Sequence, residues 1–125
     1  MAIRGLGTDI IEIARIRHSL EKSPRLVQRV LTPFEQAEYA RHAQPERYFA
    51  KRFAAKEAAA KAFGTGIGSG ISFQHFEITN DALGKPELRC SGYAAELATK
   101  MGVNAVWLSI SDEQAYACAT VILEA

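Results

Sequence analysis

The chain has 125 residues and a formal net charge of +1, with 15 Lys and Arg against 14 Asp and Glu. This length suits one domain, 1–125, that can bury a core without metal or disulfide staples but is too small for a deep internal cleft. The near-neutral charge excludes a general affinity for nucleic acid, and no run of 18 apolar residues predicts a membrane span. We therefore expect any large ligand to bind between subunits.

The two cysteines, Cys90 and Cys118, have neither a CxxC spacing nor a metal-ligand spacing. The sequence has no secretory signal, so we expect a reduced, cytoplasmic protein in which both cysteines pack in the fold.

The chain begins with apolar residues at alternate positions, interrupted by glycine, which predicts a strand over 2–8 with close backbone neighbours. Apolar residues then recur at helical spacing, which predicts a helix over 10–22 that ends at Pro24. Asp9 is expected at the joint between them. It would either cap the helix or contribute to a site.

The outer face of this first helix is basic. Arg15, Lys22 and Arg25 lie along the first third of the chain, with few acidic residues between them. A solvated face is the default interpretation, and docking of an acidic partner is the alternative.

Thr32 followed by Pro33 and Glu35 predicts a helix that runs to about residue 42. Pro45 opens a longer, alanine-rich helix, which Gly64 ends. A narrow apolar stripe on this helix is expected to face the core.

Glu57 and Lys61 lie one turn apart at the border of that stripe, with Gly64 close by. Such a pair is either a solvated contact worth about 0.3–0.5 kcal/mol or part of a site. The glycine-rich run over 64–70 matches neither common phosphate-binding fingerprint. Because it follows a helix C-terminus, which carries about half a negative charge, a phosphate held here would need a lysine or a metal.

The remainder of the chain reads mainly as strands. The predicted elements are strands at 71–79, 86–90, 103–111 and 115–123, a hairpin turn at 80–86 and a helix at 93–101. This order predicts a single α+β domain whose mostly antiparallel sheet packs against helices.

Four segments together carry a family resemblance: GLGTDIIEIARI, RFAAKEAAAKAFGTGI, NDALGKP and SISDEQAYACATVIL. They resemble the holo-[acyl-carrier-protein] synthases, the short, trimeric class of 4′-phosphopantetheinyl transferases. The resemblance spans essentially the whole chain. It implies the fold of that family and a homotrimer that transfers phosphopantetheine from coenzyme A to a serine of acyl carrier protein, with Mg²⁺.

The resemblance also assigns roles to residues. Asp9 and Glu57 match the metal ligands of the family, and Lys61 matches the lysine beside the diphosphate. This agrees with the chemistry, because hard carboxylates suit Mg²⁺ and a diphosphate needs its charge neutralised. Glu57 would take the serine proton directly or through a water on the metal.

Further positions are implied for the two substrates. Gly64, Lys85 and Pro86 resemble positions near coenzyme A, and Arg15, Lys22 and Arg25 resemble the face that docks acidic carrier protein. Trp107 is a departure, because many members have a histidine there. It could pack against the cofactor or be an ordinary sheet residue.

Arg52 is also expected to bind coenzyme A. It lies about 140° around the helix from Glu57, so both side chains cannot easily face one ligand from the same chain. We therefore expect a site shared between subunits, the alternative being that Arg52 packs on the surface. A noncatalytic coenzyme A-binding or nucleotide-binding regulator and a purely structural oligomer are the competing functions.

Overall fold

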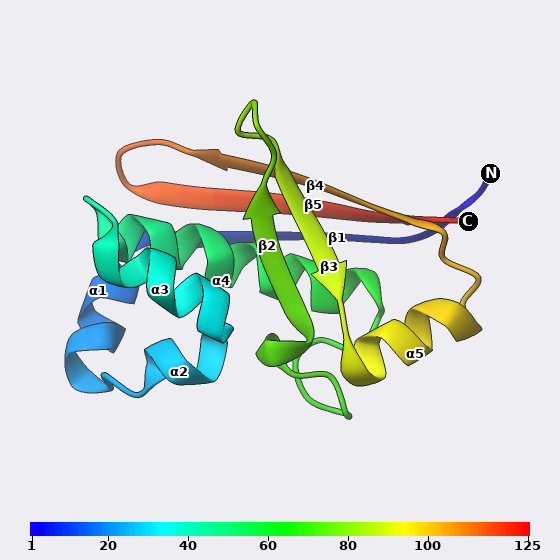
Figure 1. Cartoon of the computed structure of the whole chain (residues 1–125), viewed down its shortest axis with the longest axis horizontal. Coiled ribbons are helices and arrows are strands. Elements are labelled where there is room, and N and C mark those ends of the chain that lie inside the picture. The colour runs from blue at the N-terminus through cyan, green and yellow to red at the C-terminus, as the bar shows by residue number, and fades with distance from the viewer.

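The computed structural model describes all 125 residues, Met1–Ala125, as five strands, five α-helices and one 3₁₀ turn (Figure 1). In chain order these are β1 (Ile3–Glu12), α1 (Ile13–Lys22), α2 (Leu26–Val30), α3 (Pro33–Arg41), α4 (Pro45–Ala62), η1 (Phe73–His75), β2 (Phe76–Asn80), β3 (Pro86–Cys90), α5 (Gly92–Lys100), β4 (Ala105–Asp112) and β5 (Tyr116–Glu124). None of the helices is long and apolar enough to cross a membrane.

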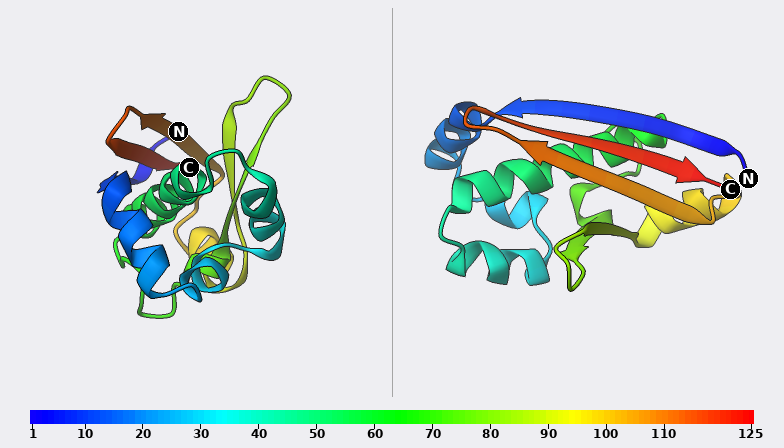
Figure 2. Two further views of the ribbon diagram at one scale, coloured as in Figure 1. Left: turned by 90° about the vertical axis from the view of Figure 1, so that its left-hand side faces the viewer. Right: turned by 90° about the horizontal axis from the view of Figure 1, so that it is seen from above.

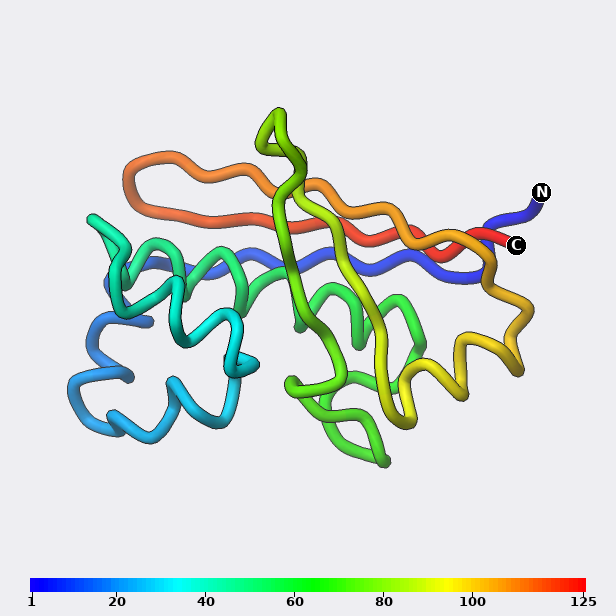
Figure 3. The backbone as a smooth tube through the Cα atoms, in the orientation of Figure 1, coloured from blue at the N-terminus to red at the C-terminus, as the bar shows by residue number.

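The strands form two antiparallel sheets, one with the order β1-β5-β4 and one consisting of the β2–β3 hairpin. Helix α4 lies along one face of the three-stranded sheet, and no element covers the opposite face (Figure 2). The two termini lie side by side, with Ala125 N–H donating to the carbonyl oxygen of Ala2 (Figure 3). The predicted α+β class is confirmed, although the strands divide into two sheets.

Two glycines allow β1 to lie directly on α4. A Cβ atom on Gly7 would lie 2.0 Å from the carbonyl oxygen of Ala58, and one on Gly5 would lie 2.0 Å from that of Ala62. Any side chain at either position would collide with the helix backbone. The close backbone neighbours predicted for this strand are therefore confirmed.

The predicted boundary between the first strand and the first helix is wrong. Strand β1 continues to Glu12, which pairs with Tyr116, and α1 begins at Ile13. Asp9 lies within the strand, opposite Ala119, and so does not cap the helix. The pairing with β5, which is more than 100 residues away in sequence, overrides the local helical spacing.

Helix α4 is buried on more sides than the predicted stripe. Eleven of its 18 residues are buried, because the large sheet covers one side while α3 and β2 cover another. The buried residues include two charged side chains, Arg52 and Lys56.

The later elements follow local signals and differ from the predicted bounds by one or two residues, with one larger shift. Strand β2 begins at Phe76 and not at residue 71 as predicted. The residues before it form the 3₁₀ turn η1, which Ser72 caps. Short helix α2 was not predicted. The capping box of Thr32 and Glu35, the helix end before Gly64 and the hairpin turn with Gly84 at φ +88° are confirmed.

Candidate active site

The structure brings Asp9, Glu57 and Lys61 together where β1 crosses α4. The Nζ atom of Lys61 lies 2.9 Å from Oδ1 of Asp9 and donates a second hydrogen bond to the carbonyl oxygen of Thr8 at 3.0 Å. The Asp9 side chain is 16% exposed and that of Lys61 49% exposed, so the cluster lies at the border between core and solvent. These three predicted residues therefore form one cluster in a single chain.

Glu57, the second carboxylate of the cluster, lies in surroundings that disfavour its negative charge. Burial raises the pKa of Glu57 above its ordinary value, the negative charge of Asp9 raises it further, and Lys61 lowers it in part. Two carboxylates that repel each other at a partly buried position would gain from a bound cation.

This donor set fits the predicted Mg²⁺. The chain has no group of three or more His, Cys, Asp or Glu side chains that could hold a metal ion by themselves. Mg²⁺ does not require such a group, because it commonly binds one or two carboxylates and takes its remaining oxygens from water and substrate phosphates. Asp9 and Glu57 supply that minimum.

The hairpin residues predicted to lie near coenzyme A are separated from this cluster. Lys85 and Pro86 lie where the β2–β3 hairpin meets β4, with Nζ of Lys85 5.4 Å from the centroid of the Trp107 ring. Trp107 in turn donates its indole hydrogen to Glu124. Since β4 and β1 are opposite edges of the same sheet, one chain does not bring Lys85 to Asp9.

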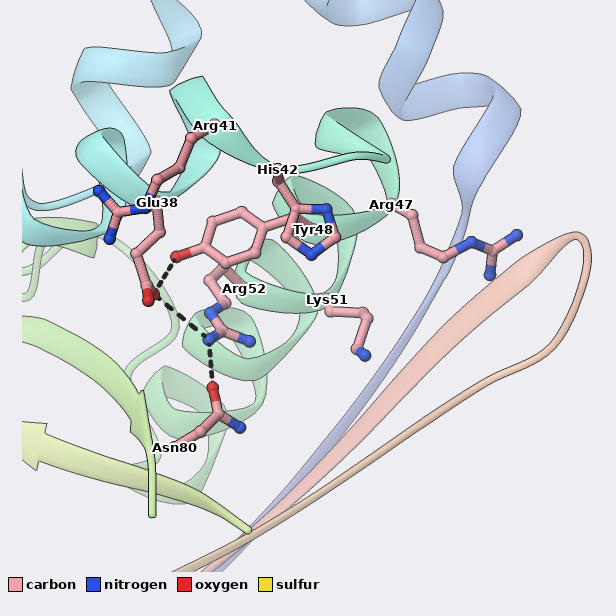
Figure 4. Close-up of a pocket in the computed structure, with 8 residues that line it drawn as sticks. All are labelled: Glu38, Arg41, His42, Arg47, Tyr48, Lys51, Arg52 and Asn80. Carbon is pink, nitrogen blue, oxygen red and sulfur yellow. Dashed lines mark hydrogen bonds and ion pairs between the residues drawn. The ribbon is translucent and has the colours of Figure 1, made fainter. Parts of the chain in front are cut away.

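Arg52 lies apart from the carboxylates, in a pocket of about 420 Å³ between α3, α4 and the end of β2 (Figure 4). Its side chain is only 5% exposed, donates to Oδ1 of Asn80 at 2.8 Å and stacks 4.5 Å from the centroid of the Tyr48 ring. Its Nε atom is buried without a hydrogen-bond partner. This placement agrees with the expectation that Arg52 and Glu57 do not face one ligand from the same chain.

The lining of this pocket is strongly basic. Glu38 is its only acidic residue, and the lining residues are Glu38, Arg41, His42, Arg47, Tyr48, Lys51, Arg52 and Asn80. Sequence reasoning found only Arg52. Some of the other lining residues share α4 with it, but the rest come from α3, the turn after α3 and the end of β2, and no short motif joins them. The one local signal was the density of basic residues between 41 and 52.

The predicted docking residues lie on the surface of α1 and the turn after it. Arg15, Lys22 and Arg25 are all exposed. Lys22 and Arg25 line a shallow hollow together with Arg29 and Leu26, and Arg15 lies nearly two turns earlier on α1. This surface therefore combines basic side chains with one apolar side chain, that of Leu26.

The comparisons with known proteins agree with this architecture. The 4′-phosphopantetheinyl transferase superfamily matches residues 5–121, and the chain belongs to that superfamily. Within it, the chain is 58% identical to the holo-[acyl-carrier-protein] synthase of Yersinia pestis, with 99% of each chain covered.

Solved structures extend the similarity. The holo-[acyl-carrier-protein] synthase of Neisseria meningitidis superposes with a TM-score of 0.93 at 42% identity, covering 99% of this chain and 100% of that one. The enzyme from Bacillus anthracis, described in complex with coenzyme A (3′,5′-ADP), gives 0.81 at 40% identity over 97% and 96% of the two chains. The predicted family and fold are thus confirmed.

Proposed function

We propose that this protein is a holo-[acyl-carrier-protein] synthase. It transfers 4′-phosphopantetheine from coenzyme A to a serine of apo acyl carrier protein and releases adenosine 3′,5′-bisphosphate. The observation that carries this assignment is the cluster of Asp9, Glu57 and Lys61, in a chain whose full length is similar to synthases of that name.

In this reaction the serine hydroxyl attacks the diphosphate of coenzyme A, whose negative oxygens repel a nucleophile. Asp9 and Glu57 would hold Mg²⁺, which would neutralise those oxygens when bound. Lys61 adds an ammonium group next to both carboxylates and can bind the phosphate that leaves. This charge offsets the partial negative charge at the C-terminus of α4, which by itself repels an anion.

Glu57 is our candidate for accepting the proton of the attacking serine. Burial and the charge of Asp9 raise the pKa of Glu57, which makes its carboxylate a stronger base than an exposed glutamate. The proton moves to Glu57 directly or through a water molecule next to it.

Coenzyme A would lie between two subunits. Arg52 with its basic pocket, and the hairpin residues Lys85 and Pro86, lie away from the carboxylates of their own chain. A neighbouring copy could place its pocket against them, and Gly64, which has open space around it, would allow the cofactor to approach the end of α4.

The uncovered face of the large sheet supports a homotrimer. It exposes large apolar side chains on all three strands, namely Leu6, Ile10, Trp107 and Tyr116. Such a patch is unusual on a monomer and typical of an interface between subunits.

Acyl carrier protein would dock on Arg15, Lys22 and Arg25, where exposed basic groups can attract an acidic partner. We place the reaction in the cytoplasm, with which the free thiols of Cys90 and Cys118 are consistent.

The main alternative is a coenzyme A-binding protein without catalysis. The paired carboxylates argue against it, because a simple binder of an anionic ligand gains nothing from two acidic groups next to its lysine. Chromatographic assay of adenosine 3′,5′-bisphosphate distinguishes the two. We expect its release only when protein, coenzyme A, Mg²⁺ and apo carrier protein are all present, and binding of coenzyme A without release would contradict the assignment.

A further inference from the structure

One ion pair lies completely inside the protein and has no place in the chemistry described above. Lys56 on α4 and Glu35 on α3 are both 0% exposed, and Nζ of Lys56 lies 2.6 Å from Oε1 of Glu35. Nζ also donates to the carbonyl oxygen of Val30, at the end of α2, at 2.6 Å. Lys56 is the residue immediately before Glu57 in α4.

Glu35 uses its two oxygens to connect different parts of the fold. Oε1 also accepts the backbone N–H of Thr32, in the capping box of α3, at 2.9 Å. Oε2 accepts the backbone N–H of Ile78, in the middle of β2, at 2.7 Å. Helix α4 is therefore joined to β2 through Lys56 and Glu35 by hydrogen bonds between fully buried groups.

A second connection runs parallel to the first. Arg52 lies one turn before Lys56 on α4, and it donates to Asn80, two residues beyond Ile78 on β2. The side of α4 that bears these two residues thus holds β2 at two points, while Glu57 and Lys61 belong to the cluster at β1. Strand β2 leads directly into the hairpin that bears Lys85 and Pro86.

Stability alone is a weak reason to bury such a pair. Moving two charges out of water is costly, and apolar replacement of a buried ion pair is often neutral or stabilising. What an apolar pair cannot supply is the directional link to the Ile78 N–H, which fixes β2 at one position along α4.

We propose that the Lys56–Glu35 pair is a positioning element that holds the β2–β3 hairpin, with Lys85 and Pro86, at a fixed place relative to Glu57 and Lys61. The roles of the positioned residues rest on the proposed function. The joint itself rests on the hydrogen bonds within the chain.

The test uses the double variant Lys56→Met/Glu35→Leu, which removes both charges together and so leaves no unpaired ion in the core. It also removes the carboxylate oxygen that accepts the Ile78 N–H. Trp107 is the only tryptophan of the chain and lies against Lys85, so its fluorescence reports on the hairpin. Lys85→Met, which removes the ammonium group from the ring, provides the reference spectrum. Circular dichroism establishes that each variant is folded.

We expect the folded double variant to shift its Trp107 emission toward that of Lys85→Met. Its KM for coenzyme A should rise about tenfold, with the KM for carrier protein unchanged, because only the hairpin side of the site is displaced. A folded variant with wild-type fluorescence and a wild-type KM for coenzyme A would overturn the proposal.

If the double variant does not fold, amide hydrogen exchange on the unaltered protein decides the question. The Ile78 N–H should exchange as slowly as the most protected amides of α4, because its hydrogen bond to Glu35 opens only when the joint breaks. Exchange of Ile78 well before α4 would refute the joint. Neither the fluorescence nor the exchange measurement requires transfer. If the unaltered protein transfers no phosphopantetheine while the Trp107 emission and the Ile78 exchange behave as expected, only the proposed function is contradicted.

Discussion

Lys61 and Asp9 form an ion pair in the protein alone, with Nζ of Lys61 2.9 Å from Oδ1 of Asp9. The lysine therefore neutralises one of the two carboxylates that we assign to Mg²⁺. A cation that binds at Asp9 has to compete with this ammonium group, which is then free to bind a phosphate oxygen.

This competition predicts opposite effects of Lys61→Met on two measurements. In the absence of coenzyme A, Mg²⁺ should bind roughly fivefold more tightly by calorimetry, because a repelling charge next to both carboxylates is gone. Transfer should fall on the order of 100-fold, because the leaving phosphate loses its lysine.

Lys51→Met is the matched control for the metal measurement, since Lys51 also lies on α4 and pairs with an aspartate, Asp112. It should leave the Mg²⁺ affinity unchanged. Unaltered or weaker Mg²⁺ binding by Lys61→Met would refute the competition.

The pKa of Glu57 supplies a second prediction. Burial and the charge of Asp9 raise it, so Asp9→Asn should lower it, both by removing that charge and by releasing Lys61 toward Glu57. The measurement is an NMR titration of the Glu57 carboxyl carbon without metal. A pKa that stays the same or rises in Asp9→Asn would show that the two carboxylates do not interact.

The same shift has a defined effect on stability. Folding raises the pKa of the Glu57 carboxyl, so this group stabilises the folded state at low pH. The contribution is lost as the pH rises from the pKa of the unfolded state through the higher pKa of the folded state. Asp9→Asn should make that loss smaller.

Local signals in the sequence predicted the parts of the fold that depend on neighbouring residues. The capping box at Thr32, the end of α4 before Gly64 and the β2–β3 hairpin are examples. The extension of β1 past Asp9 was missed, because it depends on pairing with β5 at the other end of the chain.

The residues of the candidate site likewise divide into those that could be predicted from the sequence and those that could not. Asp9, Glu57 and Lys61 were predicted to share a site through the family resemblance, and the glycine contacts of β1 on α4 explain how they meet. The basic pocket and the buried Lys56–Glu35 pair could not be predicted, because charged side chains on separate helices are exposed by default.

Docking of the carrier protein predicts a selective effect of Arg15→Glu. The KM for carrier protein should rise, with little change in the KM for coenzyme A, and the defect should shrink as salt is added, because charges at the rim of an interface mainly steer encounter. Lys100→Glu, an equal change of charge at an exposed position on α5, is the control. Equal effects of Arg15→Glu on both substrates would remove Arg15 from the docking face.

A site shared between subunits predicts complementation. Glu57→Ala and Arg52→Ala should each be inactive alone, and mixing them under conditions that allow subunit exchange should restore part of the transfer. Some mixed trimers contain one site in which both residues are intact. Full activity of Arg52→Ala alone, or an inactive mixture after exchange is verified by mass, would contradict the shared site.

The intact mass of the carrier protein tests the central claim most directly. Apo acyl carrier protein is incubated with this protein, coenzyme A and Mg²⁺, in parallel with Glu57→Gln, which removes one carboxylate charge at nearly constant volume. We predict that the carrier gains the mass of one phosphopantetheine group on a serine with the unaltered protein and gains none with Glu57→Gln. An unmodified carrier in the first reaction, or equal modification in both, would contradict the account.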